Sequence, residues 1–225
     1  TVVALSPQGL LFALETKAGK LLWSTDLVAE QGGRSPFWGF TSSPRMIDNR
    51  IVLQSGGSEG MALSAYDPVT GKRLWSAGSD DVDYQSHGIF KIDGEDHIVF
   101  HGNKKLYGVD PATGNIRWTF DHKCATSASS TSSHPVEIAE GRYFIKNSGR
   151  GGLVVQVSKT DSGYVAEKAW DTSYLGGTYI YPIYHDGLLF GYKGRILTAL
   201  DAATGDRVWR SREPGDGLPL IIDGH

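Results

Sequence analysis

The chain has 225 residues, of which 40% are hydrophobic and 21% charged, and its net charge is −3. This composition is typical of a globular protein with a sizeable core, and it lacks the basic field that nucleic-acid binding requires. No apolar run reaches the length of a membrane span, and the first residues show no charged segment of the kind that begins a signal peptide. A single cysteine, Cys124, excludes an internal disulfide.

The first predicted element is a hairpin at residues 12–23, in which a tryptophan follows a glycine by four positions. The same spacing returns along the chain at Gly19 and Trp23, Gly71 and Trp75, Gly114 and Trp118, and Gly205 and Trp209. A fourth, degenerate copy places Trp170 seven positions after Gly163. Consecutive tryptophans of this series lie 39–52 positions apart, which brackets the roughly 40–50 residues of a propeller blade.

Each copy has the pattern of a β-hairpin whose outer strand carries the tryptophan. A strand ends at Asp or Glu, and the turn that follows holds a glycine that adopts positive φ at no steric cost. The chain then returns as an antiparallel strand that ends in tryptophan. We expect this large ring to be buried against the next blade.

A second repeat precedes each hairpin and predicts the two inner strands. It consists of apolar residues, a turn of the Asp-Gly kind, and then in most copies a β-rich run. Its copies lie at 44–49, 89–94, 135–141, 182–187 and 219–224. The sequence therefore predicts an all-β fold, a single β-propeller domain over 1–225, built from four-stranded antiparallel blades. Complete blades are expected at 41–76, 86–120, 133–171 and 180–210.

The two ends of the chain together predict a fifth blade. Residues 1–23 supply its second to fourth strands, and residues 218–223 supply its first strand. Two interpretations stay open. The ends pair and close a ring, which removes exposed sheet edges, or the chain is a portion of a longer propeller.

Three hairpins, Asp67–Trp75, Asp110–Trp118 and Asp201–Trp209, resemble the pyrroloquinoline quinone (PQQ)-type propeller repeat. That family includes quinoprotein alcohol dehydrogenases, the outer-membrane assembly propeller lipoprotein and many exported bacterial proteins, typically with about seven or eight blades. The resemblance implies a periplasmic or extracellular protein. Quinoprotein dehydrogenases carry adjacent cysteines, a calcium held by Glu, Asn and Asp, and a catalytic Asp. Here no such position is matched, so we predict neither PQQ nor calcium, and the resemblance supports the fold without the chemistry.

The candidate binding residues lie in loops at one face of the propeller, around the mouth of its channel. The longest loop, 26–40, combines an arginine with three aromatic residues, which is typical of binding loops, although such rings also serve as local core. Other candidates immediately precede the inner strands. Ligand contacts are expected from Arg34, Trp38, Phe40, Tyr84, His87, His134 and Tyr181.

Two clusters contain metal-ligating residue types without a recognised spacing. His122, Cys124 and His134 are types that zinc prefers, but no fourth ligand is evident. Asp80, Asp81 and Asp83 could offer oxygens to calcium, but the EF-hand pattern is missing. We therefore predict no metal site, and we expect the acidic cluster to be a solvated turn.

The sequence favours a non-catalytic binding scaffold of an exported bacterial protein, whose ligand is a protein or a small molecule at the channel mouth. Nucleic acid and a membrane span are not expected. The alternative is a quinone-dependent dehydrogenase, or another propeller enzyme, whose catalytic residues lie partly outside this chain.

Overall fold

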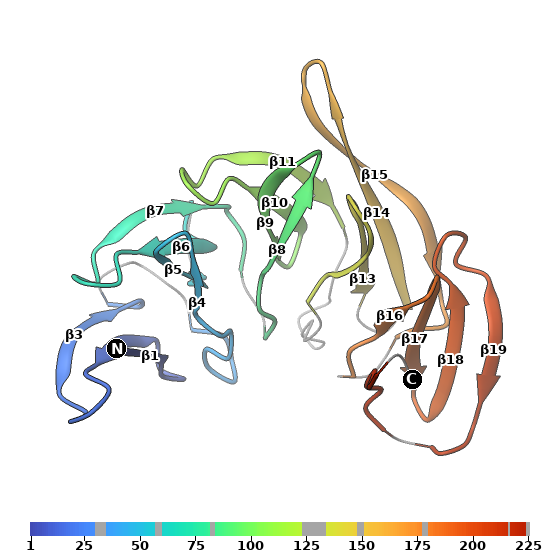
Figure 1. The fold of residues 1–225 in the computed structure, drawn as a ribbon, viewed down its shortest axis with the longest axis horizontal. Helices are drawn as coiled ribbons and strands as arrows, with labels where there is room; N and C mark the ends of the chain where they lie inside the picture. The colour runs from blue at the N-terminus through green and yellow to red at the C-terminus, as the bar shows by residue number, and fades with distance from the viewer. Residues whose placement is uncertain are drawn as a thin grey trace.

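The computed structural model describes residues 1–29, 35–56, 60–81, 84–122, 134–147, 151–176, 180–215 and 217–223. These residues form strands and turns and contain no helix, and accordingly the described ranges hold no helical segment able to span a membrane. The strands belong to five antiparallel sheets that follow one another around an open arc (Figure 1).

The first sheet has three strands and the other four have four strands each. The first and second sheets contain β1 (Val2–Leu5), β2 (Leu10–Leu14) and β3 (Leu21–Asp26), then β4 (Arg45–Ile47), β5 (Arg50–Gln54), β6 (Leu63–Tyr66) and β7 (Arg73–Ala77). The third contains β8 (Gly88–Ile92), β9 (Glu95–His101), β10 (Lys105–Val109) and β11 (Ile116–Asp121). The fourth contains β12 (Val136–Ala139), β13 (Arg142–Asn147), β14 (Gly151–Thr160) and β15 (Gly163–Thr172). The fifth contains β16 (Ile183–His185), β17 (Leu188–Lys193), β18 (Ile196–Asp201) and β19 (Arg207–Ser211).

Within each sheet the strands are hydrogen-bonded in chain order, so every blade is a simple meander. Figure 1 shows first strands such as β4 and β8 toward the inside of the arc, and the tryptophan-bearing strands β3, β7 and β11 along its outside. The predicted all-β propeller fold is confirmed.

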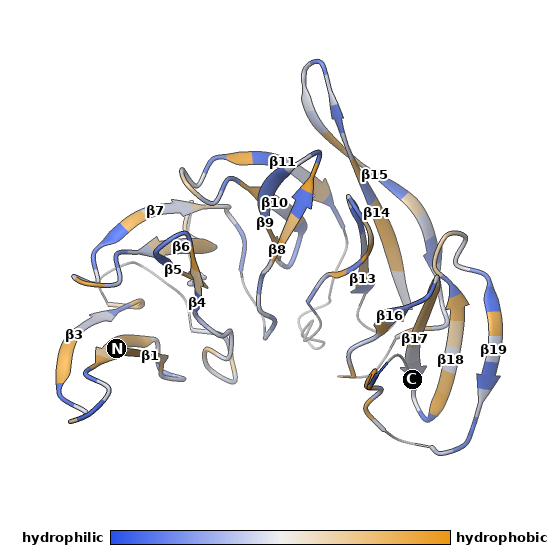
Figure 2. Cartoon of the chain, in the orientation of Figure 1, coloured by the Kyte–Doolittle hydropathy of each residue, from blue (hydrophilic) through white to orange (hydrophobic). Residues whose placement is uncertain are grey.

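Burial follows the position of a strand within its blade. All four residues of β6 are buried, whereas four of the five residues of the outer strand β19 are exposed. Figure 2 shows the same contrast between the apolar stretch of β18 and the hydrophilic β19 beside it. The core consists of apolar clusters at the junctions between neighbouring sheets, each cluster with members from both sheets. The blades therefore stabilise one another through their faces.

The Asp-x-x-Thr-Gly turn is held by its own aspartate. In the second sheet Asp67 Oδ1 accepts hydrogen bonds from the backbone N–H groups of Val69 (3.0 Å) and Thr70 (2.7 Å). These bonds lower the pKa of Asp67, because they stabilise the charged carboxylate. The turn ends at Gly71, whose φ of +71° is strained for any residue with a side chain.

The tryptophan of one blade packs on the glycine turn of the next blade. Trp23 Nε1 donates a hydrogen bond to Pro68 O (3.0 Å), and a Cβ at Gly71 would lie 2.5 Å from Trp23 Cε3. The same contact joins Trp75 to Gly114 and Trp170 to Gly205. These three rings thus pack against the following blade as predicted, although each is only partly buried.

Replacing Gly71 with alanine is expected to destabilise the protein more than the same change at Gly19. Both glycines occupy the same turn with similar φ (+71° and +65°), but a Cβ at Gly19 would meet nothing within 4 Å. The backbone strain is common to both variants, so the difference, about 1–3 kcal/mol, measures the contact with Trp23. Urea unfolding of the two variants measures this difference. Equal losses in the free energy of unfolding would contradict the contact between Trp23 and the Gly71 turn.

The fourth sheet departs from the repeat because its outer hairpin is longer. β14 and β15 have ten residues each, and their tip extends beyond the arc in Figure 1. This hairpin lies against the third sheet, where Tyr164 packs edge-on to His97 with ring centroids 4.6 Å apart. Trp118 consequently packs parallel to Tyr143 instead of on a glycine turn.

Among the described residues, the two ends of the chain do not pair. The first sheet has only β1, β2 and β3, and residues 218–223 form no strand. Asp223 nevertheless has a φ of +50°, as do, within a few degrees, the turn residues Asp48, Asp93 and Asp186 after other first strands. The segment thus keeps the local conformation that its repeat predicts, while ring closure is not seen in the described residues.

Candidate binding face

The connections between sheets emerge on one face of the arc, which we call the loop face. Of the described residues, it carries 27–29, 35–44, 78–81, 84–87, 122, 134–135, 173–176 and 180–182, together with the ends of β5, β9 and β13. The opposite face, the turn face, carries the tight turns such as 48–49, 93–94 and 140–141. Every antiparallel meander places these two kinds of connection at opposite edges of a blade.

An exposed aromatic pair is the most prominent feature of the loop face. Phe37 is 88% exposed and Trp38 is 73% exposed, and their rings meet edge to face with centroids 4.8 Å apart. The Trp38 backbone N–H donates a hydrogen bond to the Tyr84 hydroxyl (2.9 Å), which ties the loop to the next between-sheet connection. Trp38 and Tyr84, both predicted as binding residues, are therefore brought together.

Phe40 and His87 are placed differently from the prediction. Phe40 is 4% exposed and packs in the apolar core between the first and second sheets. His87 is 1% exposed. Because both side chains are buried, they have no surface to offer a ligand. They support the loop face from beneath instead. Arg34 lies outside the described residues.

His134 and Tyr181 form a second aromatic contact, with ring centroids 4.7 Å apart. Arg45, on the inner strand β4, donates to the backbone oxygen of His87 (3.0 Å). Desolvation and the charge of Arg45 lower the pKa of His134, and burial raises the pKa of Tyr181. The predicted candidates His87, His134 and Tyr181, which precede the third, fourth and fifth sheets, thus share one neighbourhood with Arg45.

A buried polar cluster lies under this face, and the sequence analysis missed most of it. Gln54 and Gln85 both donate from Nε2 to the backbone oxygen of His101, at 3.0 and 2.8 Å. Because that oxygen is an acceptor, the two amide Oε1 atoms must point elsewhere, and in the described structure they have no partner. His101 stacks on His122 with centroids 4.3 Å apart, and all four ring nitrogens also lack partners there.

The signal for this cluster is present in the repeat. Gln54, His101 and Lys146 occupy the same position, near the loop-face end of the second strand of their blades, and all three are buried. A buried polar residue that follows three apolar or aromatic residues at the same strand position in three successive blades is unusual. Burial also lowers the pKa of Lys146 to about 8, and its Nζ donates to Ile180 O (3.0 Å).

Among the described residues no three His, Cys, Asp or Glu side chains are grouped so that they could hold a metal ion. His101 and His122 are nearly parallel, so one ion cannot lie in both ring planes at coordination distance. Asp80 is 4% exposed, and its Oδ2 accepts from the backbone N–H groups of Lys104 (2.8 Å) and Lys105 (3.0 Å). Our expectation of a solvated acidic turn was therefore wrong for Asp80, which is a buried structural carboxylate with a pKa raised by desolvation. Cys124 and Asp83 lie outside the described residues.

The polar side chains of the loop face are also poorly suited to holding a quinone cofactor together with calcium. Its described polar groups are mainly amides, imidazoles and hydroxyls, whereas calcium prefers several carboxylate or carbonyl oxygens. Among the described residues this face offers one buried carboxylate, Asp80, whose Oδ2 accepts two backbone N–H groups and whose Oδ1 has no partner there. A single free carboxylate oxygen is too few for calcium. These groups are suited to hydrogen-bonding a ligand rather than to holding a divalent ion.

Comparisons with solved structures support the fold. BamB from Moraxella catarrhalis has a TM-score of 0.65 at 12% identity, over 95% of this chain and 61% of that chain. The β-propeller domain of Cps50 (Swd1) from Myceliophteria thermophila has a TM-score of 0.55 at 11% identity, over 95% of this chain and 70% of that one. At such low identity the likeness shows a β-propeller and nothing about activity.

A short segment of the sequence is similar to quinone-dependent enzymes. The dehydrogenase subunit of a quinone alcohol dehydrogenase from Gluconacetobacter polyoxogenes is 36% identical over 72 residues, which is 30% of this chain and 10% of the relative. A quinohemoprotein alcohol dehydrogenase from Pseudomonas putida is 37% identical over 70 residues, 9% of its length. The matched segment thus spans about a tenth of these relatives. The family model described as outer membrane protein assembly factor BamB, in contrast, matches residues 1–211, and the chain belongs to this family of PQQ-like β-propellers.

Proposed function

We propose that this propeller is a non-catalytic binding platform of an exported bacterial protein, periplasmic or extracellular, that engages a protein partner through its loop face. The observation that carries the proposal is the exposed pair Phe37–Trp38, fixed to the neighbouring connection by Tyr84. Exposed aromatic rings held by a rigid scaffold are the side chains that most often dominate the energy of protein interfaces. The assembly-factor description of the family supports the same role and location.

His134 and Tyr181 extend the proposed contact surface across the loop face, and Arg45, on β4 of the second sheet, adds a positive charge near His134. Arg34 belongs to the same loop as Trp38 and stays a predicted contact. A small-molecule ligand is the other occupant that this mixture of rings and hydrogen-bonding groups would suit.

Replacing Trp38 with alanine is expected to abolish capture of the partner while leaving the fold intact, because the ring is 73% exposed. Immobilised protein would be exposed to a periplasmic extract, and the bound species identified by mass spectrometry. Val69→Ala is the matched control, since Val69 is an apolar residue, 80% exposed, on the turn face. A species retained by the wild type and by Val69→Ala, but lost with Trp38→Ala, supports the platform. Equal retention by all three proteins contradicts it.

The alternative, a quinone-dependent dehydrogenase, is favoured by the short matches to alcohol dehydrogenases. The donor set of the loop face gives it no support. Dye-linked alcohol oxidation by the protein after addition of PQQ and calcium would overturn the non-catalytic proposal.

A further inference from the structure

The turn face contains a cleft where the repeat is broken. Its volume is about 610 Å³, and the lining residues are Ile92, Asp93, Glu140, Val157, Ser158, Lys159, Thr160 and Asp161. They come from the β8–β9 turn, the β12–β13 turn and the long β14–β15 hairpin. At this junction the hairpin replaces the short turn that receives a tryptophan elsewhere, so the cleft is a product of the insertion.

The bottom of the cleft has little apolar surface to offer a ligand. Ile92 is 3% exposed and Val157 is 2% exposed, because both already pack in the core between the third and fourth sheets. Recognition in this cleft must therefore come from its polar and charged rim.

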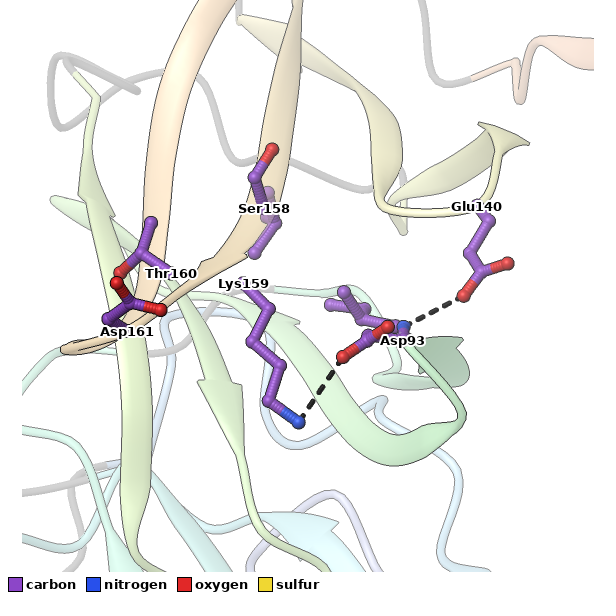
Figure 3. Close-up of a pocket in the computed structure, with 8 residues that line it drawn as sticks. Asp93, Glu140, Ser158, Lys159, Thr160 and Asp161 are labelled. Carbon is purple, nitrogen blue, oxygen red and sulfur yellow. Dashed lines mark hydrogen bonds and ion pairs between the residues drawn. The ribbon is translucent and has the colours of Figure 1, made fainter.

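The rim of the cleft carries more carboxylates than its own ammonium group can neutralise. It contains the carboxylates of Asp93, Glu140 and Asp161 against one ammonium group, that of Lys159. Lys159 is already shared between Glu95 (2.7 Å) and Asp93 (3.2 Å). Glu140 and Asp161 form no ion pair with any residue that the structure describes, and Figure 3 shows them on opposite sides of Lys159.

Glu140 is held in place by the backbone of the neighbouring turn. Its Oε1 accepts a hydrogen bond from the Asp93 N–H (2.8 Å), as Figure 3 shows, which leaves Oε2 for another donor. Burial, and then the negative charge of Glu140, raises the pKa of Glu137 nearby. The site thus presents a positioned carboxylate in a region of negative potential.

A compact divalent ion does not fit this arrangement. The carboxylates come from three separate turns, and the described residues provide no group of three side chains that could hold a metal. A guanidinium group is planar and carries five N–H donors, so it can reach a carboxylate and neighbouring hydroxyls at the same time. Ser158 supplies such a hydroxyl on the hairpin, whereas Thr160 Oγ1 already donates to Gly163 O (2.9 Å) and lies 3.2 Å from Ser162 Oγ.

We propose that this cleft binds an arginine side chain of a protein partner, with the guanidinium group between Glu140 and the tip of the β14–β15 hairpin. The site lies on the turn face, so it is separate from the aromatic surface of the loop face, and the failure of either proposal leaves the other unaffected.

The test is an NMR titration of the full chain with the blocked peptide Gly-Arg-Gly, and with the same peptide carrying uncharged citrulline in place of arginine. The Asp93 amide is the reporter, because its N–H donates to Glu140. We expect saturable shifts of this amide and of the turn at 140–141 with the arginine peptide only. No saturable shift, or equal shifts with citrulline, overturns the proposal.

Glu140→Gln removes the charge but keeps an oxygen that accepts from Asp93, so the fold is expected to persist, which a melting curve verifies. Its affinity for the arginine peptide is expected to fall roughly fivefold, as for loss of one exposed charge pair. Glu167→Gln, an exposed acid on β15 outside the cleft, is the control and should bind as the wild type does. An equal loss in both variants would show a diffuse charge effect and overturn the site.

Discussion

Replacing Trp118 with alanine is expected to lower the free energy of unfolding by about 3–5 kcal/mol, the range for removal of a buried aromatic side chain. Trp118 is 4% exposed, and its ring lies parallel to that of Tyr143 with centroids 6.3 Å apart. Its Nε1 donates to His97 Nδ1 (3.2 Å). The variant therefore leaves both a cavity and a buried imidazole without its partner, and each is costly.

Trp38→Ala is the control for this prediction. Since Trp38 is 73% exposed, its removal is expected to change the free energy of unfolding by no more than about 0.5 kcal/mol, as for most surface residues. Chemical denaturation with far-UV circular dichroism compares the two. Equal losses would mean that Trp38 is part of the core and that Trp118 is not the centre of its junction.

Lowering the pH from 7 to 5 is expected to destabilise the protein by about 2 kcal/mol for each buried neutral histidine. Burial lowers the pKa of His87 to about 3, that of His122 to about 4, and that of His101 well below its usual value. In the unfolded chain these groups titrate near pH 6.5, so the unfolded state binds more protons below that pH. The stability is therefore complete above pH 6.5 and is lost as the pH falls toward 3–4.

Thermal melts between pH 7 and pH 5 check this dependence, because ordinary carboxylates remain ionised in that interval. The double variant His101→Gln, His122→Gln removes the stacked pair and should show a smaller decrease over the same interval, even if it is less stable at pH 7. A wild-type melting temperature that does not change between pH 7 and pH 5 would contradict the buried, neutral state of these histidines.

The fold could be predicted from the sequence because the information is local and repeated. Each Asp-x-x-Thr-Gly turn makes its own hydrogen bonds, as Asp67 does, and each tryptophan stands at a fixed distance from its glycine. The degenerate copy ending at Trp170 was recognisable only as an irregular spacing. That its hairpin extends over the third sheet depends on contacts with His97 and Glu95, which no local pattern encodes.

The candidate site was less predictable because exposure depends on neighbouring blades. Trp38 and Phe40 are two positions apart in one loop, yet the first is exposed and the second is core. Gln54 and His101 lie far apart in the chain and meet only because adjacent sheets bring their second strands together. A polar residue at a repeated strand end indicates such a cluster, but its partners are set by packing.

The contact between tryptophan and glycine turn has a direction, and this bears on how many blades such an array can hold. Trp209, at one end of the arc, is 40% exposed, and at the other end no described residue lies within 4 Å of a Cβ placed at Gly19. These are the two halves of one heterologous contact, which is the kind that propagates unless geometry closes it. The contact itself therefore does not fix the number of blades. That number depends on the curvature of the arc and on what packs against its two terminal surfaces.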